Sequence, residues 1–93
     1  MKKITYEYMR GFADRASQLH KASRSIFITS ADQDLLRSIY TFLTLEKFRC
    51  YWTDMGDRYG IRISGKESLK AWRKRIGFSN EDKMQQLTVL IGE

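Results

Sequence analysis

Two segments of the chain, 48–53 and 58–64, alternate polar with apolar side chains. A period of two residues is typical of a β-strand that turns one face to the core and the other to solvent. The polar positions of these segments carry arginines and hydroxyl groups but no carboxylate: Arg49, Tyr51, Thr53, Arg58 and Arg62. A guanidinium fork donates paired hydrogen bonds to phosphate oxygens or to the edge of guanine. The pattern therefore indicates a surface that binds a polyanion, with duplex DNA as the first candidate.

A second group of candidate contact residues lies upstream, around an expected turn near residues 22–23. Residues 17–21 and 25–29 are predicted as the strands of a first hairpin, because the run Ile26–Ile28 favours the extended state. This hairpin adds three candidate DNA-binding residues: His20, Lys21 and Arg24. The alternative for both hairpins is the ordinary solvent-facing side of an antiparallel sheet, which is polar in many proteins.

The other reactive side chains do not form a recognisable site. His20 has no second histidine or cysteine nearby, which argues against a zinc site. Cys50 falls on the apolar side of its strand and is expected to fill the core rather than act as a nucleophile. The sequence at 64–66 lacks the spacing and the upstream glycine of a phosphate-binding loop. We therefore expect no resident cofactor.

The composition of the 93 residues is that of a folded domain, with 42% hydrophobic and 30% charged residues. The formal net charge of +6 favours nucleic acid as a partner, although a solvated basic surface gives the same charge. One cysteine cannot form an intramolecular disulfide, and no stretch resembles a signal peptide or a membrane span. We expect a single domain over residues 1–93, located in the cytoplasm and without membrane contact.

The apolar periodicity predicts the elements that must position these groups. Helices are expected at about 5–16, 30–43, 64–76 and 79–91. With the two hairpins in place, the order is helix, two strands, helix, two strands, helix, helix. This order predicts an α+β domain, αββαββα(α), with a four-stranded antiparallel sheet and the helices on one face.

Polar residues predict where the helices begin, and glycines predict where two of them end. The expected N-terminal caps are Thr5, the pair Ser30 and Gln33, the pair Ser64 and Glu67, and the pair Ser79 and Asp82. Gly77 is expected to end the third helix and Gly92 the last, because glycine adopts the left-handed conformation that terminates many helices.

The segment Met9–Ser17 in the first expected helix carries a more specific pattern. It matches a motif of nine positions best at the third to the sixth, which here are Gly11, Phe12, Ala13 and Asp14. In these residues the segment resembles the signature helix of the LAGLIDADG homing endonucleases. The stretch 60–66, followed by 76–78 and Lys83, is also similar to the second half of a repeat of this family.

The resemblance implies a LAGLIDADG-like fold in which a saddle-shaped sheet lies along the major groove of DNA. It also implies a homodimer in which two signature helices pack side by side. Close approach of two helices needs a residue with almost no side chain, which Gly11 supplies. Asp14 is expected to face the partner helix too, with Arg10 near the seam. The alternative is a tolerated glycine in an ordinary amphipathic helix, at a cost of about 1 kcal/mol relative to alanine.

The eighth position of the signature holds the metal-binding acid in the family, and this chain has Ala16 there. Magnesium requires hard oxygen ligands, which an alanine side chain lacks. Asp14 lies two residues earlier, about 200° around the helix axis, and is a weak substitute. No intact catalytic residue is therefore expected, and Mg²⁺ is expected only if a nuclease function persists.

Three functions follow from these observations. The first is a homodimeric, double-stranded DNA-binding protein on an endonuclease scaffold, without efficient cleavage. The second is a metal-dependent homing-type endonuclease with an unusual metal site, or half of a heterodimer whose partner supplies the acid. The third is a protein-interaction or regulatory module that kept the fold and lost DNA binding.

Overall fold

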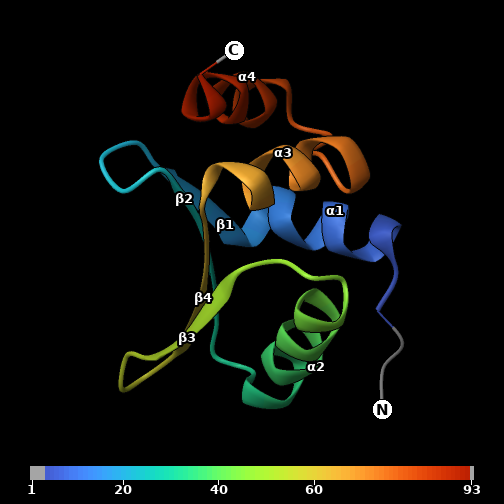
Figure 1. Cartoon of the computed structure of the whole chain (residues 1–93). Coiled ribbons are helices and arrows are strands. Elements are labelled where there is room, and N and C mark those ends of the chain that lie inside the picture. Colours follow the sequence, from blue (N-terminus) through green and yellow to red (C-terminus); the bar gives the residue numbers. More distant parts are fainter. Residues whose placement is uncertain (1–3, 93) are drawn as a thin grey trace.

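The computed structural model describes residues 4–92, and within this range the chain forms four α-helices and one four-stranded antiparallel sheet (Figure 1). The elements run in the order α1 (Tyr6–Ala16), β1 (Ser17–His20), β2 (Ser25–Ser30), α2 (Gln33–Leu45), β3 (Cys50–Asp54), β4 (Tyr59–Ser64), α3 (Lys66–Arg75) and α4 (Glu81–Ile91). The predicted α+β class and the predicted order of the elements are confirmed.

The sheet consists of two hairpins that meet at their inner strands. The strand order is β1-β2-β4-β3, so β2 and β4 are central and β1 and β3 are the edges. The central strands pair antiparallel, with Ile28 opposite Ile61 and Phe27 opposite Arg62. The helices lie on one side of the sheet, and the turns of both hairpins point away from them (Figure 1).

The core lies between the helices and one face of the sheet. Four isoleucines of the central strands form its floor, and all are fully buried: Ile26, Ile28, Ile61 and Ile63. The helices cover this floor with the apolar positions that the periodicity predicts, which include Met9, Ala13, Leu36, Ile39, Leu43, Leu69, Trp72 and Leu87. Burial of each large apolar side chain stabilises the fold by about 1.5–3 kcal/mol relative to leaving it exposed.

Helix α1 begins at the predicted cap. The hydroxyl of Thr5 accepts a hydrogen bond from the backbone N–H of Tyr8 at 3.1 Å, and Glu7 lies in the first turn. Such a cap satisfies one of the backbone donors that a helix start leaves unpaired. The helix ends where Ser17 enters the sheet, and the Ser17 hydroxyl donates back to the carbonyl of Ala13. The chain thus passes from α1 into β1 without a loop.

The predicted capping box at Ser30 and Gln33 is wrong. Ser30 is the last residue of β2 and pairs with Tyr59, so its backbone is held in the extended state. The cap of α2 is Asp32, whose carboxylate accepts a hydrogen bond from the N–H of Leu35 at 3.0 Å. The sheet register therefore delays the helix beyond Ser30.

The predicted capping box at Ser64 and Glu67 is wrong for the same reason. Ser64 ends β4 opposite Ser25. Helix α3 follows after Gly65, which has a φ of +93° and provides no side-chain cap. A positive φ of this size suits glycine and turns the chain sharply from the strand into the helix.

Helix α4 starts after Asn80 and not after Ser79, which is where the sequence placed the cap. The Asn80 side chain accepts a hydrogen bond from the N–H of Lys83 at 3.1 Å. Gly77, with a φ of +69°, follows α3, and Gly92, with a φ of +87°, ends α4, as predicted. Within residues 4–92 no helix has the length and apolar character that a membrane crossing requires.

Candidate nucleic-acid interface

The sheet face opposite the helices is open, and the alternation along β3 and β4 places the predicted side chains on it. Tyr51 and Thr53 of β3 and Arg62 of β4 are exposed, and Arg49, just before β3, is exposed too. The intervening residues Phe48, Cys50, Trp52, Ile61 and Ile63 are buried or half-buried on the helix side. The predicted assignment of the two faces of this hairpin is confirmed.

The strand register aligns four residues of the open face across the whole sheet. Gln18 of β1 is opposite Phe27 of β2, which is opposite Arg62 of β4, which in turn is opposite Tyr51 of β3. We call Gln18, Phe27, Arg62 and Tyr51 the central row. Directly opposite residues on one face have Cβ atoms about 4.5–5.5 Å apart, so side chains of the central row lie within reach of their neighbours.

Arg62 lies over the aromatic ring of Tyr51, with its Cζ atom 5.8 Å from the ring centroid. Tyr51 itself is 47% exposed. A cation–π contact of this kind orients a guanidinium group without the charge neutralisation that a carboxylate would bring. Arg62 therefore presents an oriented positive charge near the middle of the open face.

Phe27 is a residue that the sequence did not identify as part of this surface. Its ring lies over Gly60, where an added Cβ atom would come within 2.6 Å of the ring Cζ. The ring of His20 lies beside it, with 5.6 Å between the two ring centroids. A glycine inside a strand often marks a close approach of another group. Gly60 is therefore the feature of the sequence that could have indicated a side chain lying over β4.

The remaining sequence candidates lie around the central row. Arg58 is in the exposed turn before β4, where the N–H of Met55 donates to its carbonyl at 2.9 Å. Arg24 has a φ of +49° in the turn between β1 and β2, whose start is Lys21. These two turns bring cations to the ends of both hairpins, whereas Arg62 is central.

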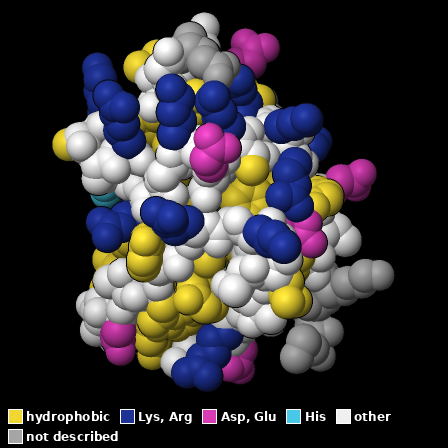
Figure 2. All heavy atoms as spheres, viewed as in Figure 1, with side chains coloured by type: hydrophobic (Ala, Val, Ile, Leu, Met, Phe, Trp, Pro, Cys, Tyr) yellow, Lys and Arg dark blue, Asp and Glu magenta, His cyan; other side chains and the backbone are white. Residues whose placement is uncertain are grey.

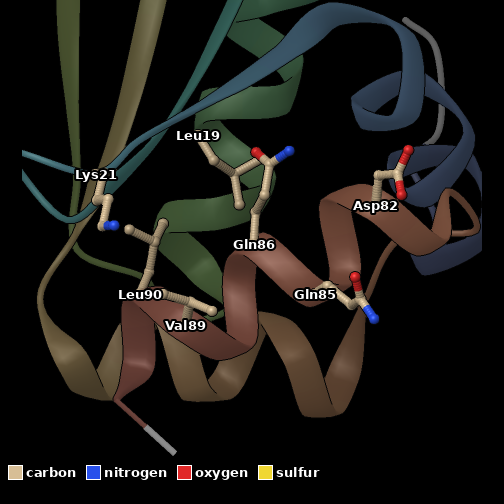
Figure 3. Close-up of a pocket in the computed structure, with 7 residues that line it drawn as sticks. All are labelled: Leu19, Lys21, Asp82, Gln85, Gln86, Val89 and Leu90. Atoms are coloured by element: carbon tan, nitrogen blue, oxygen red, sulfur yellow. The ribbon is translucent and has the colours of Figure 1, made fainter.

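Lys21 also borders a separate hollow, a groove of about 500 Å³ between β1 and α4 (Figure 3). Its lining combines aliphatic, amide and charged side chains: Leu19, Lys21, Asp82, Gln85, Gln86, Val89 and Leu90. The carboxylate of Asp82 makes this groove less suited to a polyanion than the open face. The structure thus separates Lys21 in part from the other predicted DNA contacts.

Basic side chains are not confined to the open face. Lys and Arg residues also gather over and around α3 (Figure 2). This helix carries five of them: Lys66, Lys70, Arg73, Lys74 and Arg75. Arg75 is engaged within the fold, since it donates to the carbonyl of Glu46 at 3.0 Å and pairs with the Glu46 carboxylate. The net charge alone therefore does not locate a binding site.

The surface of α1 gives different roles to the three predicted interface residues. Gly11 is exposed, and a Cβ atom added there would have no other atom within 4 Å. Arg10 donates through Nε to the carbonyl of Ile76 at 2.7 Å. Asp14 accepts hydrogen bonds from the backbone of the α3–α4 connection, at Ser79. Gly11 is thus exposed without a contact, while the polar atoms of Arg10 and Asp14 bind other parts of the same chain.

The carboxyl end of α1 holds an ammonium group where the resemblance implies a carboxylate. The Nζ atom of Lys83 donates to the carbonyls of Asp14 at 2.7 Å and Ser17 at 2.8 Å. Burial lowers the pKa of Lys83, and the charge of Asp14 opposes that shift. Ala16 lies half-buried at this helix end. Across the described residues, no group of three or more His, Cys, Asp or Glu side chains could hold a metal ion.

Cys50 fits the role of a packing residue. It is half-buried, and burial raises the pKa of its thiol, partly offset by a hydrogen bond with Thr44. A raised pKa reduces the thiolate fraction and hence the nucleophilicity.

Comparisons with protein-family models, with curated proteins and with solved structures found no match for this chain.

Proposed function

We propose that this protein binds double-stranded DNA as a homodimer on a LAGLIDADG-like scaffold, without efficient cleavage. The observation that carries the proposal is the open sheet face, where arginines and hydroxyl groups stand on both sides of the central row. The positions of the four strands that face this side carry no carboxylate; Asp54, the last residue of β3, alternates to the other side with Cys50 and Trp52. A polyanion therefore meets attraction over the strands of this face, whereas Asp54 and Asp57 lie at the β3–β4 turn.

The arrangement of the two hairpins supports a duplex as the ligand. The major groove of B-DNA is about 12 Å wide and admits a two-stranded ribbon. Both hairpin turns project from the sheet on the side away from the helices, so they can follow the duplex beyond the central row (Figure 1). Arg24 and Arg58, in or beside these turns, are placed to bind phosphates, which give affinity without sequence preference.

The homodimer is supported by Gly11. Outside its own helix, no atom of residues 4–92 lies within 4 Å of the position that a Cβ atom at Gly11 would take, so the packing within one chain does not require a glycine there. A glycine inside a helix destabilises it by about 1 kcal/mol relative to alanine. Pairing of two α1 helices explains why a glycine occupies this position, since only glycine permits the closest approach of two helix backbones.

The residues at the end of α1 support the proposed absence of efficient cleavage. In-line attack on a phosphate by metal-bound water needs ligands for the metal ion. Ala16 contributes none, and the Asp14 carboxylate accepts hydrogen bonds from backbone N–H groups of the α3–α4 connection. Lys83 places a positive charge at the same helix end, which opposes the binding of a cation.

A charge-reversal experiment tests the proposal. The variant Arg49→Glu/Arg58→Glu/Arg62→Glu removes cations from the open face, and fluorescence anisotropy with a labelled duplex measures the affinity. We expect a loss of at least about 100-fold and a flatter dependence on salt, because each lost phosphate contact reduces the slope by about 0.9. The matched control Arg37→Glu/Lys66→Glu/Lys74→Glu changes the net charge equally on exposed helix positions.

The control distinguishes binding at the open face from attraction by the net charge of the whole protein. An affinity that falls equally in both triple variants would mean that net charge, and not the open face, attracts DNA. A wild-type protein that binds duplexes no better than an unrelated basic protein would leave a protein-interaction role as the better explanation of the exposed Gly11.

A further inference from the structure

Phe27 is an aromatic residue placed against the sheet on an otherwise polar face. It is half-buried in the central strand β2, yet it points away from the core that Ile26 and Ile28 enter. The neighbouring strand holds Gly60 at the diagonal position, and any larger residue there would meet the Phe27 ring. Glycine weakens a strand interior, and at Gly60 it leaves the space that the far end of the Phe27 ring occupies.

The ring lies in a small apolar area surrounded by cations and polar groups. Met55 approaches the same position, with its Sδ atom 3.4 Å from the Cβ that an alanine at Gly60 would have. Met55 is 44% exposed, and the His20 ring lies on the β1 side of Phe27. The half-buried Phe27 ring and the exposed Met55 of the β3–β4 turn give the open face apolar atoms near Arg62, which fits a ligand that carries both negative charge and apolar groups.

Arg62 is the direct cross-strand neighbour of Phe27. Its other neighbour is Tyr51, whose ring holds the guanidinium group in a cation–π contact. Arg62 therefore lies between two aromatic residues on a central strand, whereas Arg49 and Arg58 lie outside the ends of their strands. The contact with Tyr51 and the position in a central strand orient Arg62, whereas a cation in a turn lacks a paired strand on either side.

We infer that Phe27 and Arg62 read a thymine and a guanine that are close neighbours in a DNA target, an inference that rests on the proposed function. The major-groove edge of thymine carries a 5-methyl group, which an apolar side chain contacts. The edge of guanine carries O6 and N7, which an arginine fork binds through two hydrogen bonds. Adjacent central strands lie about 4.8 Å apart, so the two bases lie within about two base pairs of each other.

The experiment begins with selection of duplexes from a random pool by the wild-type protein. Each thymine of the selected sequence is then replaced singly by dU, which removes only the 5-methyl group, and each guanine by 7-deazaguanine, which removes N7. We expect one thymine in each half-site at which dU weakens wild-type binding by about 4-fold, the value of one buried methyl group. A 7-deazaguanine nearby weakens binding by about 5-fold or more.

Two variants assign these effects to residues. Phe27→Ala is expected to bind the thymine and dU duplexes equally, and Arg62→Gln to lose the preference for guanine at the neighbouring position. If Phe27→Ala unfolds, Phe27→Leu is used in its place. Leucine keeps the apolar bulk of the side chain and changes only the shape of the group that contacts the thymine methyl. The control Arg58→Gln is expected to weaken binding to all sequences alike, as loss of a phosphate contact does.

The outcomes distinguish this inference from the proposed function. The inference is overturned if the protein binds selected duplexes but no thymine-to-dU replacement weakens that binding. It is also overturned if such a replacement weakens binding equally in the wild type and in Phe27→Ala. Both outcomes leave DNA binding intact. Duplex binding without any sequence preference also overturns the inference and leaves DNA binding intact. Tighter Phe27-dependent binding to single-stranded DNA shows a base-stacking platform instead. No binding to DNA removes the proposed function and the inference together.

Discussion

The carboxylate of Asp14 accepts hydrogen bonds from the backbone N–H of Ser79, at 2.9 Å to one oxygen and 3.2 Å to the other. It also accepts one from the N–H of Asn80 at 3.2 Å. A residue of the signature-like helix thus binds the start of α4, where unpaired N–H groups and the helix dipole favour a negative charge. Asp14 links the first helix of the chain to the start of the last one.

Replacement of Asp14 tests that link. We expect Asp14→Ala to lower the free energy of unfolding by about 1–2 kcal/mol, because it leaves backbone donors at the start of α4 without their acceptor. Urea unfolding followed by circular dichroism measures the change. The control Asp57→Ala removes an acid from an exposed turn and is expected to stay within about 0.5 kcal/mol of the wild type. Equal effects of the two substitutions would contradict the structural role of Asp14.

Lys83 predicts a pH dependence of stability. Its pKa is lowered in the folded chain by burial, so between that value and the usual value near 10.4 the unfolded chain binds more protons than the folded one. The contribution of Lys83 to stability therefore increases as the pH rises through this window. The difference in unfolding free energy between wild type and Lys83→Met, measured from neutral to alkaline pH, is expected to shift in favour of the wild type. A difference that is constant over this range would contradict the lowered pKa.

Gly11 allows dimer formation to be separated from folding. Nothing lies near its position within the subunit, so Gly11→Leu is expected to fold as a stable monomer while the wild type is a dimer. Gly11→Ala is expected to stabilise the isolated subunit by up to about 1 kcal/mol through helix propensity. Sedimentation equilibrium measures the mass, and Thr41→Leu places the same bulk on an exposed position of α2 as a control. A Gly11→Leu protein that still dimerises would exclude α1 as the interface.

Gly60 and Phe27 are expected to be energetically coupled. An alanine at Gly60 meets the far end of the Phe27 ring, so Gly60→Ala is expected to displace the ring and to be less favourable in the wild type than in a Phe27→Ala background. A coupling energy of about 0.5 kcal/mol or more between the two substitutions is expected for residues in contact. Thermal unfolding of the four proteins of this cycle provides the values, and simple additivity would show that the ring does not lie over Gly60.

Ala16 is the position at which catalysis can be sought. If the scaffold carries the remaining groups of a nuclease, Ala16→Asp is expected to nick supercoiled plasmid in Mg²⁺ faster than the wild type, because it supplies an oxygen ligand. Ala16→Asn is the matched control, with the same size and no charge. Unchanged nicking by an Ala16→Asp protein that still binds DNA would show that further catalytic groups are missing.

The order of helices and strands and the two faces of the second hairpin could be predicted from local sequence patterns. The period-two alternation in 48–53 and 58–64 assigns side chains to opposite faces whatever lies around the strands. The apolar positions of the helices likewise identify their buried sides, as Met9 and Ala13 illustrate. The helix caps were less predictable, because the backbone at Ser30 and Ser64 is held by strand pairing that short sequence patterns do not encode.

Which residues meet depends on the packing of elements that lie far apart in the sequence. Phe27 becomes a neighbour of Arg62 through the pairing of β2 with β4, and Asp14 reaches Ser79 through the packing of α1 beside the α3–α4 connection. Local periodicity arises from the geometry of one strand or helix. Register and packing arise from contacts between residues dozens of positions apart, which the chain selects only when it buries its whole core at once.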